Sequence, residues 1–319
     1  MRVTIVEEPY SAGEQLVDGY FRGRFAIQHD VPQISPFSGL LFDQARVGPL
    51  ERVTTPPYDT ISAEDQYRFR RAGPHNIVRL DLGEQHPADD DVAAKYRRAA
   101  SELRRWREDG VLSLTPRPGY FPYEMRFALR GVPRRVHGLI CQVELEPWGG
   151  SIVPYERTMV GPVEGRLQLL QAVRANLSAA YAVFPRRQRS LSRLLDEIMD
   201  LPPTSYITDE SGVEHRMWTL EGARDDLTSV RPDDPLLIAD GHHRFAVALR
   251  FREEMRARHG PGPWDQMMML VVDAATEDPP VLPVHRVLAS GWRLRERALG
   301  FPASRKPSPP SPTRSSSTA

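Results

Sequence analysis

The chain has 319 residues, with 42 basic and 42 acidic side chains and a formal net charge of zero. This neutral balance argues against a protein that coats nucleic acid or an anionic membrane over its whole surface. The single cysteine, Cys141, excludes an internal disulfide and a cysteine-based zinc site, and it indicates a reducing compartment. No signal-peptide pattern and no run of about 18 apolar residues occurs, so we expect a soluble, cytoplasmic protein without a membrane partner.

The first third of the chain predicts a short extension, a turn and two helices with a strand between them. Residues 1–30 read as the extension, and the prolines of "TPPYDTIS" impose an extended backbone before Asp59. Ser62, with Asp65 three residues later, is predicted to cap a helix. The segment "NIVRLDL" indicates a strand. From Val92 onward, apolar residues at spacings of three and four predict an amphipathic helix; they are Tyr96, Ala99, Leu103 and Trp106.

The middle and end of the chain predict two hairpins, two helices and a strand–helix–strand unit. "YFPYEMRFAL" and "RRVHGLICQVELE" flank Gly131 and read as a hairpin with one buried face. Helices are predicted over 162–177 and about 190–199, followed by a second hairpin that turns at Ser211-Gly212. "PLLIAD", a helix over 241–258 and "MMMLVVDA" form the strand–helix–strand unit. The tail over 293–319 is rich in proline and serine and reads as disordered.

The segment "ADGHHR" holds the densest group of reactive side chains, at the junction between an apolar strand and a helix. The first N–H groups of a helix have no partner within it, so this junction suits an anion such as phosphate. Gly241 allows close approach of a ligand, Arg244 offers a planar fork, and His243 can donate a proton. Three other interpretations stay open. In the first, Asp240 only caps the helix and Arg244 pairs with a nearby carboxylate. In the second, the histidines form hydrogen bonds within the fold. In the third, Asp240 and the two histidines hold a metal ion. No second cluster at ligand spacing accompanies them, so no metal site is predicted.

A second group of candidates lies in "VPYERTMVGPVEGRLQLLQAVRAN". Glu156 and Arg157 precede the predicted helix and are candidate catalytic residues, because a carboxylate beside an arginine can act as a base or hold a metal-bound phosphate. Asp59 is a third catalytic candidate. Further residues that could face a cleft are Arg166, Arg174, Asn176 and His285. A solvated helix face with a loop ion pair explains the same pattern without a function.

Six segments, in chain order, resemble one bacterial and archaeal domain-of-unknown-function family whose members are sometimes labelled ParB-like. They are "FSGLLFD", "TPPYDTIS", "HNIVRLDLG", residues 154–176, "LIADGHHRFAVAL" and "LPVHRVL". The resemblance covers about residues 34–292, and "ADGHHR" is its most specific part. The same corner is similar to the Gly-x-x-Arg phosphate-binding turn of the ParB and sulfiredoxin superfamily, which includes nucleotide-binding partition proteins and a free-serine kinase.

This resemblance implies that Gly241, His242, His243 and Arg244 surround nucleotide phosphates at the start of a helix. Sulfiredoxin activity is disfavoured, because His242 stands where that group carries its reactive cysteine. The chain also departs from the family at polar positions: Tyr155 replaces a histidine, and other positions lose a lysine, an aspartate, a glutamate and a threonine. Because of these losses, the interpretation that the protein is a non-catalytic paralogue stays open. Family members continue well beyond "LPVHR", so we interpret the chain as C-terminally truncated.

Together these observations predict an α+β fold: a β-rich N-terminal part with helices, and a ParB/sulfiredoxin-like strand–helix–strand corner. The expected regions are 1–30, 31–230, 231–292 and 293–319. The predicted function is a nucleotide-binding phosphotransferase acting on a small polar metabolite, with a nucleoside di- or triphosphate and Mg²⁺ as cofactors. The rivals are a ParB-like nucleotide-binding regulatory module and the non-catalytic paralogue. Neutral charge and the lack of a helix-turn-helix pattern disfavour DNA binding, and the sequence leaves the oligomeric state open.

Overall fold

The structure is a computed structural model that describes residues 31–148, 150–154, 160–222, 234–277, 279 and 280. Its strands are β1 (Ile34–Ser35), β2 (Leu40–Phe42), β3 (Leu112–Leu114), β4 (Gly119–Leu129), β5 (Val132–Glu144), β6 (Ile152–Pro154), β7 (Ala180–Phe184), β8 (Ser205–Thr208), β9 (Glu214–Met217), β10 (Leu220–Glu221), β11 (Leu236–Asp240) and β12 (Gln266–Asp273). Its α-helices are α2 (Gln44–Val47), α3 (Ala63–Ala72), α4 (Val78–Asp81), α5 (Ala94–Glu108), α6 (Val160–Val173), α7 (Arg189–Met199), α9 (His242–His259) and α10 (Ala274–Glu277). Single 3₁₀ turns occupy Leu50–Arg52, Tyr58–Thr60 and Pro263–Asp265.

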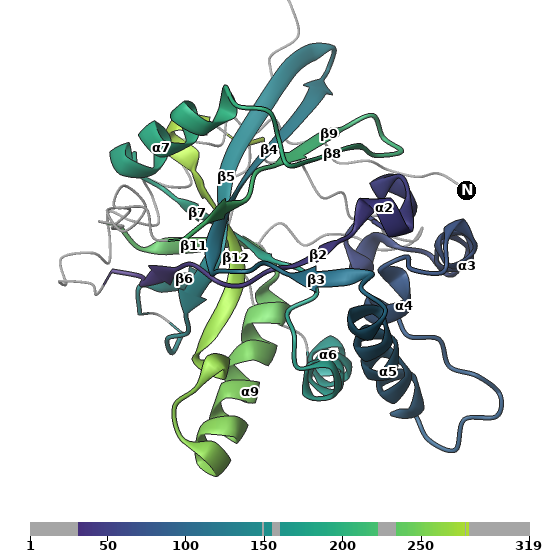
Figure 1. The fold of residues 1–319 in the computed structure, drawn as a ribbon. Helices are drawn as coiled ribbons and strands as arrows, with labels where there is room; N and C mark the ends of the chain where they lie inside the picture. Colours follow the sequence, from purple (N-terminus) through teal and green to yellow (C-terminus); the bar gives the residue numbers. More distant parts are fainter. Residues whose placement is uncertain (1–30, 149, 155–159, 223–233, 278, 281–319) are drawn as a thin grey trace, which may run out of the picture. The chain divides into compact units, whose positions relative to one another are not determined.

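The predicted α+β class is confirmed: helices pack on a large mixed sheet (Figure 1). The sheet follows the strand order β6, β11, β7, β12, β5, β4, β9, β8, with β1 paired to β5 and β10 paired to β4. Strands β2 and β3 form a separate two-stranded sheet. None of the helices described is long and apolar enough to span a bilayer.

Strands β4 and β5 form the first predicted hairpin, and two residues connect them. Arg130 and Gly131 at the tip both have positive φ, 51° and 79°. Positive φ at both central residues is the type I′ turn, whose twist matches that of the two strands. Strands β8 and β9 form the second predicted hairpin, and Gly212 in its turn has a φ of 82°. Both hairpin predictions are confirmed.

One hydrophobic cluster joins the middle strands of the sheet to helices α7 and α9. Its members include Leu139, Cys141 and Val143 of β5, Met267, Met269 and Val271 of β12, Ala180, Ala182 and Phe184 of β7, Leu191, Leu194, Leu195 and Ile198 of α7, and Phe245, Ala248 and Leu249 of α9. The alternating apolar positions of β5 are therefore buried, as predicted. Burial also raises the pKa of the Cys141 thiol, which makes it a packing residue rather than a reactive thiol.

The predicted strand–helix–strand unit is β11, α9 and β12, but the two strands are not neighbours. Strand β7 lies between them, antiparallel to β11 and parallel to β12. Strands β11 and β12 therefore run in opposite directions, so α9 is not the crossover of a parallel βαβ unit. The predicted boundary at residue 230 stays a prediction, and the regions 1–30 and 293–319 lie outside the described residues.

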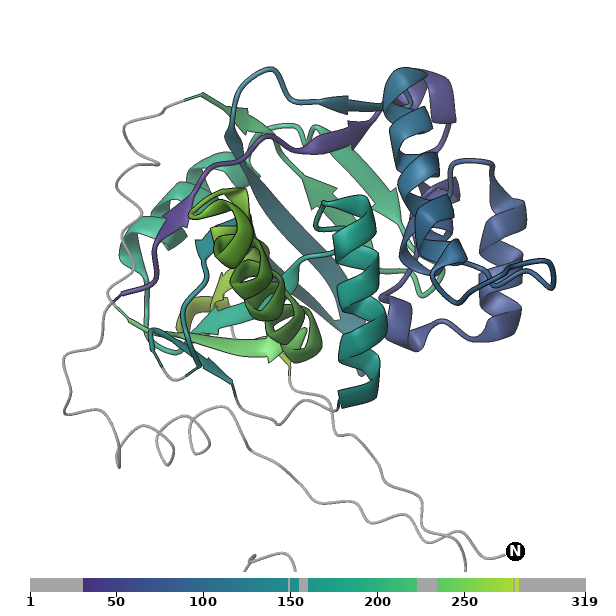
Figure 2. The ribbon, with the colours of Figure 1, turned by 90° about the horizontal axis from the view of Figure 1, so that it is seen from below.

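Helices α9, α6 and α5 lie side by side, next to the sheet (Figures 1 and 2). On α6, Leu167 packs against α9, and Leu169 and Val173 pack against α5. Two polar pairs join α6 to α9: Glu164 to Arg250 at 2.8 Å, and Gln171 to Glu254 at 2.6 Å. The later residue of α6 pairs with the later residue of α9, so the two helices run in the same general direction.

The N-terminal predictions have a mixed outcome. The Ser62 cap is confirmed, since Ser62 Oγ accepts a hydrogen bond from the Asp65 N–H at 3.0 Å, and α5 is the predicted amphipathic helix. The strand predicted over "NIVRLDL" is wrong, because Val78–Asp81 form α4. The Asn76 side chain accepts a hydrogen bond from the Val78 N–H at 3.0 Å and starts a helical turn there. Val78 and Leu80 are both buried, which explains the strand-like alternation.

The helix predicted over 162–177 begins and ends earlier than expected. It spans Val160–Val173, and Arg174 follows it with a φ of 53°. A left-handed residue directly after a helix ends it and turns the chain away. The chain then needs six residues to reach Ala180, the first residue of β7.

Candidate functional site

The segment "ADGHHR" forms a tight corner between β11 and α9. Asp240 is the last residue of β11, Gly241 is the N-cap position, and α9 begins at His242. Gly241 has a φ of 88°, in the left-handed region that glycine adopts without strain. It supplies no capping side chain to a helix of 18 residues. The Phe245 N–H donates to the Gly241 carbonyl at 3.0 Å, which closes the first turn.

Gly241 is also required by its surroundings. A Cβ at this position would lie 3.1 Å from both Cα and Cβ of Ala180 and 3.0 Å from Nε of Arg244. The backbone of the corner is therefore in contact with the start of β7 on one side and with the Arg244 side chain on the other. Any larger residue at 241 would have to displace one of them.

Arg244 ties the corner together. Its side chain is 13% exposed; one terminal nitrogen donates to the Asp240 carboxylate, and the other donates to the Ala179 carbonyl. Its Nε–H is buried and has no hydrogen-bond partner among the described residues. The pairing with Asp240 is the carboxylate contact that the non-functional interpretation expects. The unsatisfied Nε–H lies next to Gly241, 3.0 Å from the point where a Cβ on that residue would stand.

The other polar residues of the corner differ in accessibility. The Asp240 carboxylate is 56% exposed and makes no capping hydrogen bond to α9, so its predicted role as a cap is not what the structure shows. His242 is 2% exposed, and His243 is partly buried. The two adjacent histidines therefore occupy different environments, as their angular separation on a helix predicts.

Arg166 joins three segments that the sequence analysis singled out separately. Its guanidinium carbon lies 3.2 Å from the centre of the Tyr58 ring, and a terminal nitrogen donates to the Asp81 carboxylate at 2.6 Å and to the Asp81 carbonyl at 3.0 Å. The segments "TPPYDTIS" and "NIVRLDL" thus meet on α6. Its other terminal nitrogen is buried and without a hydrogen-bond partner in the described part of the chain. Asp59, next to Tyr58, is exposed.

The remaining predicted residues do not join these contacts. Arg174 is exposed at the end of α6, where it donates to the Gln171 carbonyl and lies over the ring of Phe251. Asn176 is exposed in the link to β7. Glu156, Arg157 and His285 lie outside the described residues.

A row of buried charges that the sequence did not predict crosses the sheet. Glu124 on β4 is fully buried and lies opposite both His137 on β5 and Arg216 on β9. His137 Nε2 is 2.9 Å from a Glu124 oxygen, and His137 Nδ1 is 3.3 Å from a Glu277 oxygen. Arg126 Nε donates to the second Glu124 oxygen at 2.8 Å. A histidine inside the apolar alternation of β5 was the one sequence signal that could have indicated this row.

Burial and ion pairing act in opposite directions on these groups. Burial alone would lower the pKa of His137, but its hydrogen bonds to Glu277 and Glu124 outweigh burial and raise that pKa above the ordinary value. Burial alone would raise the pKa of Glu124, but Arg126 and His137 lower it overall. Both ring nitrogens of His137 face a carboxylate, and only the imidazolium can donate to both. The row is therefore a network of formal charges.

Comparison with known proteins identifies the family but supplies no activity. No curated protein and no solved structure matches the chain. The family model described as "Protein of unknown function (DUF1015)" matches residues 34–300, which is most of the 319 residues. The chain therefore belongs to the DUF1015 family of proteins of unknown function.

Proposed function

We propose that the Asp240–Arg244 corner binds the phosphates of a nucleoside di- or triphosphate, and that the protein transfers a phosphoryl group from it to a small polar metabolite. The observation that carries this proposal is Gly241. It stands with a φ of 88° between a buried strand and an 18-residue helix, and it supplies no side chain to cap the first N–H groups of that helix. A helix start without a capping side chain is a favourable place for phosphate oxygens.

The arrangement of two helices adds to this support. Helices α6 and α9 lie side by side and run in the same general direction. Their N-terminal ends, each with the positive end of a helix dipole, therefore belong to the same side of the helix pair. The dipole of α9 favours an anion at its own first turn.

Arg244 supplies the nearest cationic group. It is held by Asp240 and Ala179, so its position is fixed before a ligand arrives, and its Nε–H still lacks a hydrogen-bond partner among the described residues. A fixed guanidinium binds phosphate with less loss of side-chain entropy than a flexible lysine. The resemblance of "ADGHHR" to a known phosphate-binding turn agrees with this role.

Magnesium enters the proposal with the nucleotide. No group of three His, Cys, Asp or Glu side chains that could hold a metal occurs in the described part of the chain. The ion would therefore bind chiefly through phosphate oxygens and water, which is how Mg²⁺ commonly binds at nucleotide sites. The exposed Asp240 carboxylate is the nearest protein oxygen that could join it. Glu156, Arg157 and Asp59 remain the proposed base and acceptor-side residues.

The rival functions use the same corner and differ from the phosphotransferase only after the nucleotide has bound. A ParB-like regulatory module or a non-catalytic paralogue would bind nucleotide without passing on a phosphoryl group. The polar residues missing relative to the family, such as the histidine replaced by Tyr155, favour the second rival. Phosphate transfer to a mixture of hydroxyl-bearing metabolites would separate the phosphotransferase from both rivals.

Isothermal titration with ATP, ADP, CTP and GTP, each with and without magnesium, tests the binding step. Arg244→Ala should weaken binding by about 1.5–3 kcal/mol, roughly tenfold to more than a hundredfold, because a charge-assisted hydrogen bond is lost. Arg258→Ala, which removes an exposed arginine in the last turn of the same helix, is the matched control and should bind like the wild type. Unchanged affinity in a folded Arg244→Ala variant, or no binding at all, would overturn the proposal.

A further inference from the structure

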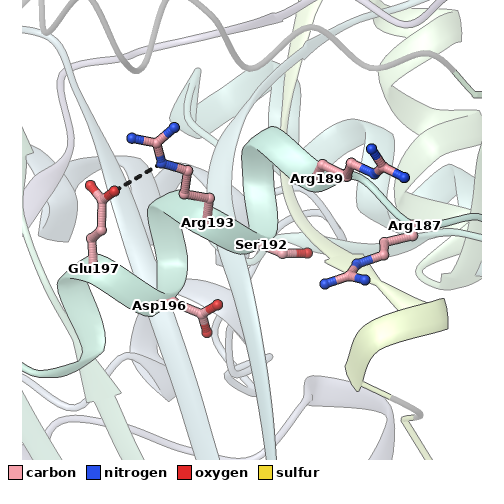
Figure 3. A pocket seen from close by; sticks show the side chains of 6 residues that line it. All are labelled: Arg187, Arg189, Ser192, Arg193, Asp196 and Glu197. Atoms are coloured by element: carbon pink, nitrogen blue, oxygen red, sulfur yellow. Dashed lines mark hydrogen bonds and ion pairs between the residues drawn. The ribbon is translucent and has the colours of Figure 1, made fainter.

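A cavity of about 380 Å³ opens along helix α7, at the other end of β7 from Gly241. Six residues of α7 and the segment before it line this cavity: Arg187, Arg189, Ser192, Arg193, Asp196 and Glu197 (Figure 3). The cavity is open to solvent, and its volume is large enough for a small molecule. Every lining residue is polar or charged, so its chemistry points to a charged, water-soluble ligand.

The charges of the cavity are divided between its two ends. Arg187 and Arg189 lie at the start of α7, and Asp196 lies about two helical turns later. Arg193 and Glu197 pair with each other at 3.1 Å and so neutralise one another. The side chains of Arg187, Arg189 and Asp196 have no hydrogen bond or ion pair to any residue that the structure describes. The unneutralised charges are therefore positive at one end and negative at the other.

This distribution is the reverse of what the helix itself favours. A helix dipole stabilises acidic side chains near the N-terminus and basic side chains near the C-terminus. Helix α3 follows that rule, with Glu64 and Asp65 in its first turn and Arg70 and Arg71 in its last. Helix α7 has no acidic residue in its first turn and no basic residue in its last. Local preferences that are broken in this way are expected at functional sites.

The start of α7 is held in place by a buried carboxylate. Asp273, at the end of β12, accepts hydrogen bonds from the Gln188 N–H and the Ser192 hydroxyl, both at 2.8 Å. These two bonds fix the first turn of α7 to the sheet. Arg187 and Asp196 therefore extend from a rigid element, which lowers the entropy cost of binding.

We propose that this cavity binds a small zwitterion whose carboxylate and ammonium groups are several bonds apart, such as an ω-amino acid or a short peptide. The carboxylate would bind Arg187 and Arg189, and the ammonium group would bind Asp196. Asp196 is seven positions after Arg189, which is roughly 10 Å along a helix. A compact α-amino acid is too short to reach both ends of the cavity. A purely anionic ligand would meet the Asp196 carboxylate. The proposal is independent of the nucleotide corner.

Titration of the full-length protein with zwitterions of increasing length tests the inference. The probes are glycine, β-alanine, γ-aminobutyrate and ε-aminocaproate, with caproate and hexylamine as single-charge controls. Affinity should rise with length, and ε-aminocaproate should bind at least about tenfold more tightly than caproate or hexylamine. Equal binding of caproate and ε-aminocaproate, or no binding of any probe, would overturn the proposal.

Two variants assign the ends of the ligand. Asp196→Asn should remove the preference for ε-aminocaproate over caproate, and Arg187→Gln should weaken the binding of both. Asp200→Asn, at the exposed end of the same helix, and Arg107→Gln, on the exposed face of α5, are controls that should bind like the wild type. All four positions are exposed, so the variants should fold. A zwitterion preference that survives in Asp196→Asn would contradict the assignment.

Discussion

His137 and Glu277 are joined twice, through the backbone and through the side chain. The His137 N–H donates to one Glu277 oxygen at 2.7 Å, and His137 Nδ1 lies 3.3 Å from the other. Helix α10 is thereby held against β5 at the point where the strand partner β12 has ended. Because Glu124 occupies the other ring nitrogen, the two contacts of the His137 side chain together require a protonated imidazole.

This contact should make the stability of the protein depend on pH. A raised pKa of His137 in the folded state contributes stability that is full below about 6.5, the unfolded value, and that is lost as the pH rises through the folded value. His137→Gln should cost about 1–3 kcal/mol at pH 6 and less at alkaline pH. Urea unfolding of both proteins between pH 6 and 9 measures the difference. His86→Gln, at an exposed site, is the control. A gap that stays constant over this range would contradict the protonated network.

Gly241→Ala should lower the free energy of unfolding more than Gly212→Ala, a replacement that causes only backbone strain. Gly212 has a nearly equal φ of 82° and no neighbour within 4 Å of an added Cβ, whereas at Gly241 the added atom would contact Ala180. Gly212→Ala should therefore cost about 1–2 kcal/mol, the usual cost of a left-handed residue. Gly241→Ala should cost about 1–3 kcal/mol more because of crowding. Chemical denaturation gives both values, and equal losses would show that the corner has room for a methyl group.

Asp273→Asn should weaken the attachment of both α7 and α10. Beyond its bonds to Gln188 and Ser192, the carboxylate accepts from the N–H groups of Ala275 and Thr276, both at 3.1 Å. An asparagine amide has only one oxygen that accepts hydrogen bonds. Its NH₂ group would therefore lie against N–H or O–H groups that also donate. We expect a loss of about 2–3 kcal/mol in the free energy of unfolding. Asp196→Asn, which removes an exposed carboxylate, should change it by less than about 0.5 kcal/mol.

Arg166→Lys should separate geometry from charge at the junction of α4, α6 and Tyr58. A lysine keeps the positive charge but lacks the planar group that lies flat on Tyr58 while it donates to Asp81. The expected cost is about 1–2 kcal/mol in the free energy of unfolding. Arg107→Lys on α5, an exposed site, should leave it unchanged. If both substitutions are neutral, charge alone explains the contact.

Much of the fold follows from local sequence patterns. The Ser62 cap, the hairpin turn at Gly131 and the strand–helix–strand order around Gly241 each depend on residues close together in the chain, and all three are confirmed. The strand predicted over "NIVRLDL" failed for a physical reason. Buried Val78 and Leu80 alternate as in a strand, while Asn76 sets the backbone through bonds to Arg52 and Thr54, more than twenty residues earlier.

The sequence predicts which residues belong to the corner but not which contacts they make in the fold. The sequence places Asp240 and Arg244 near each other on a helix start, but it cannot show that Arg244 also donates to Ala179 at the head of another strand. It marks Arg166 and the region of Tyr58 separately, and only the fold brings them into contact. The row formed by Glu124, His137 and Glu277 depends on strand register, which a single sequence does not determine.

The position of β7 between β11 and β12 has a consequence for how the corner is assembled. Strand β7, which lies between β11 and β12, comes from about fifty residues earlier in the chain. Without it, the segment from β11 to β12 would have two unpaired strand edges. Such a stretch cannot behave as an independent module. The corner around Gly241 is therefore completed by a contact between residues about sixty positions apart, because Ala180 lies where a side chain on residue 241 would stand.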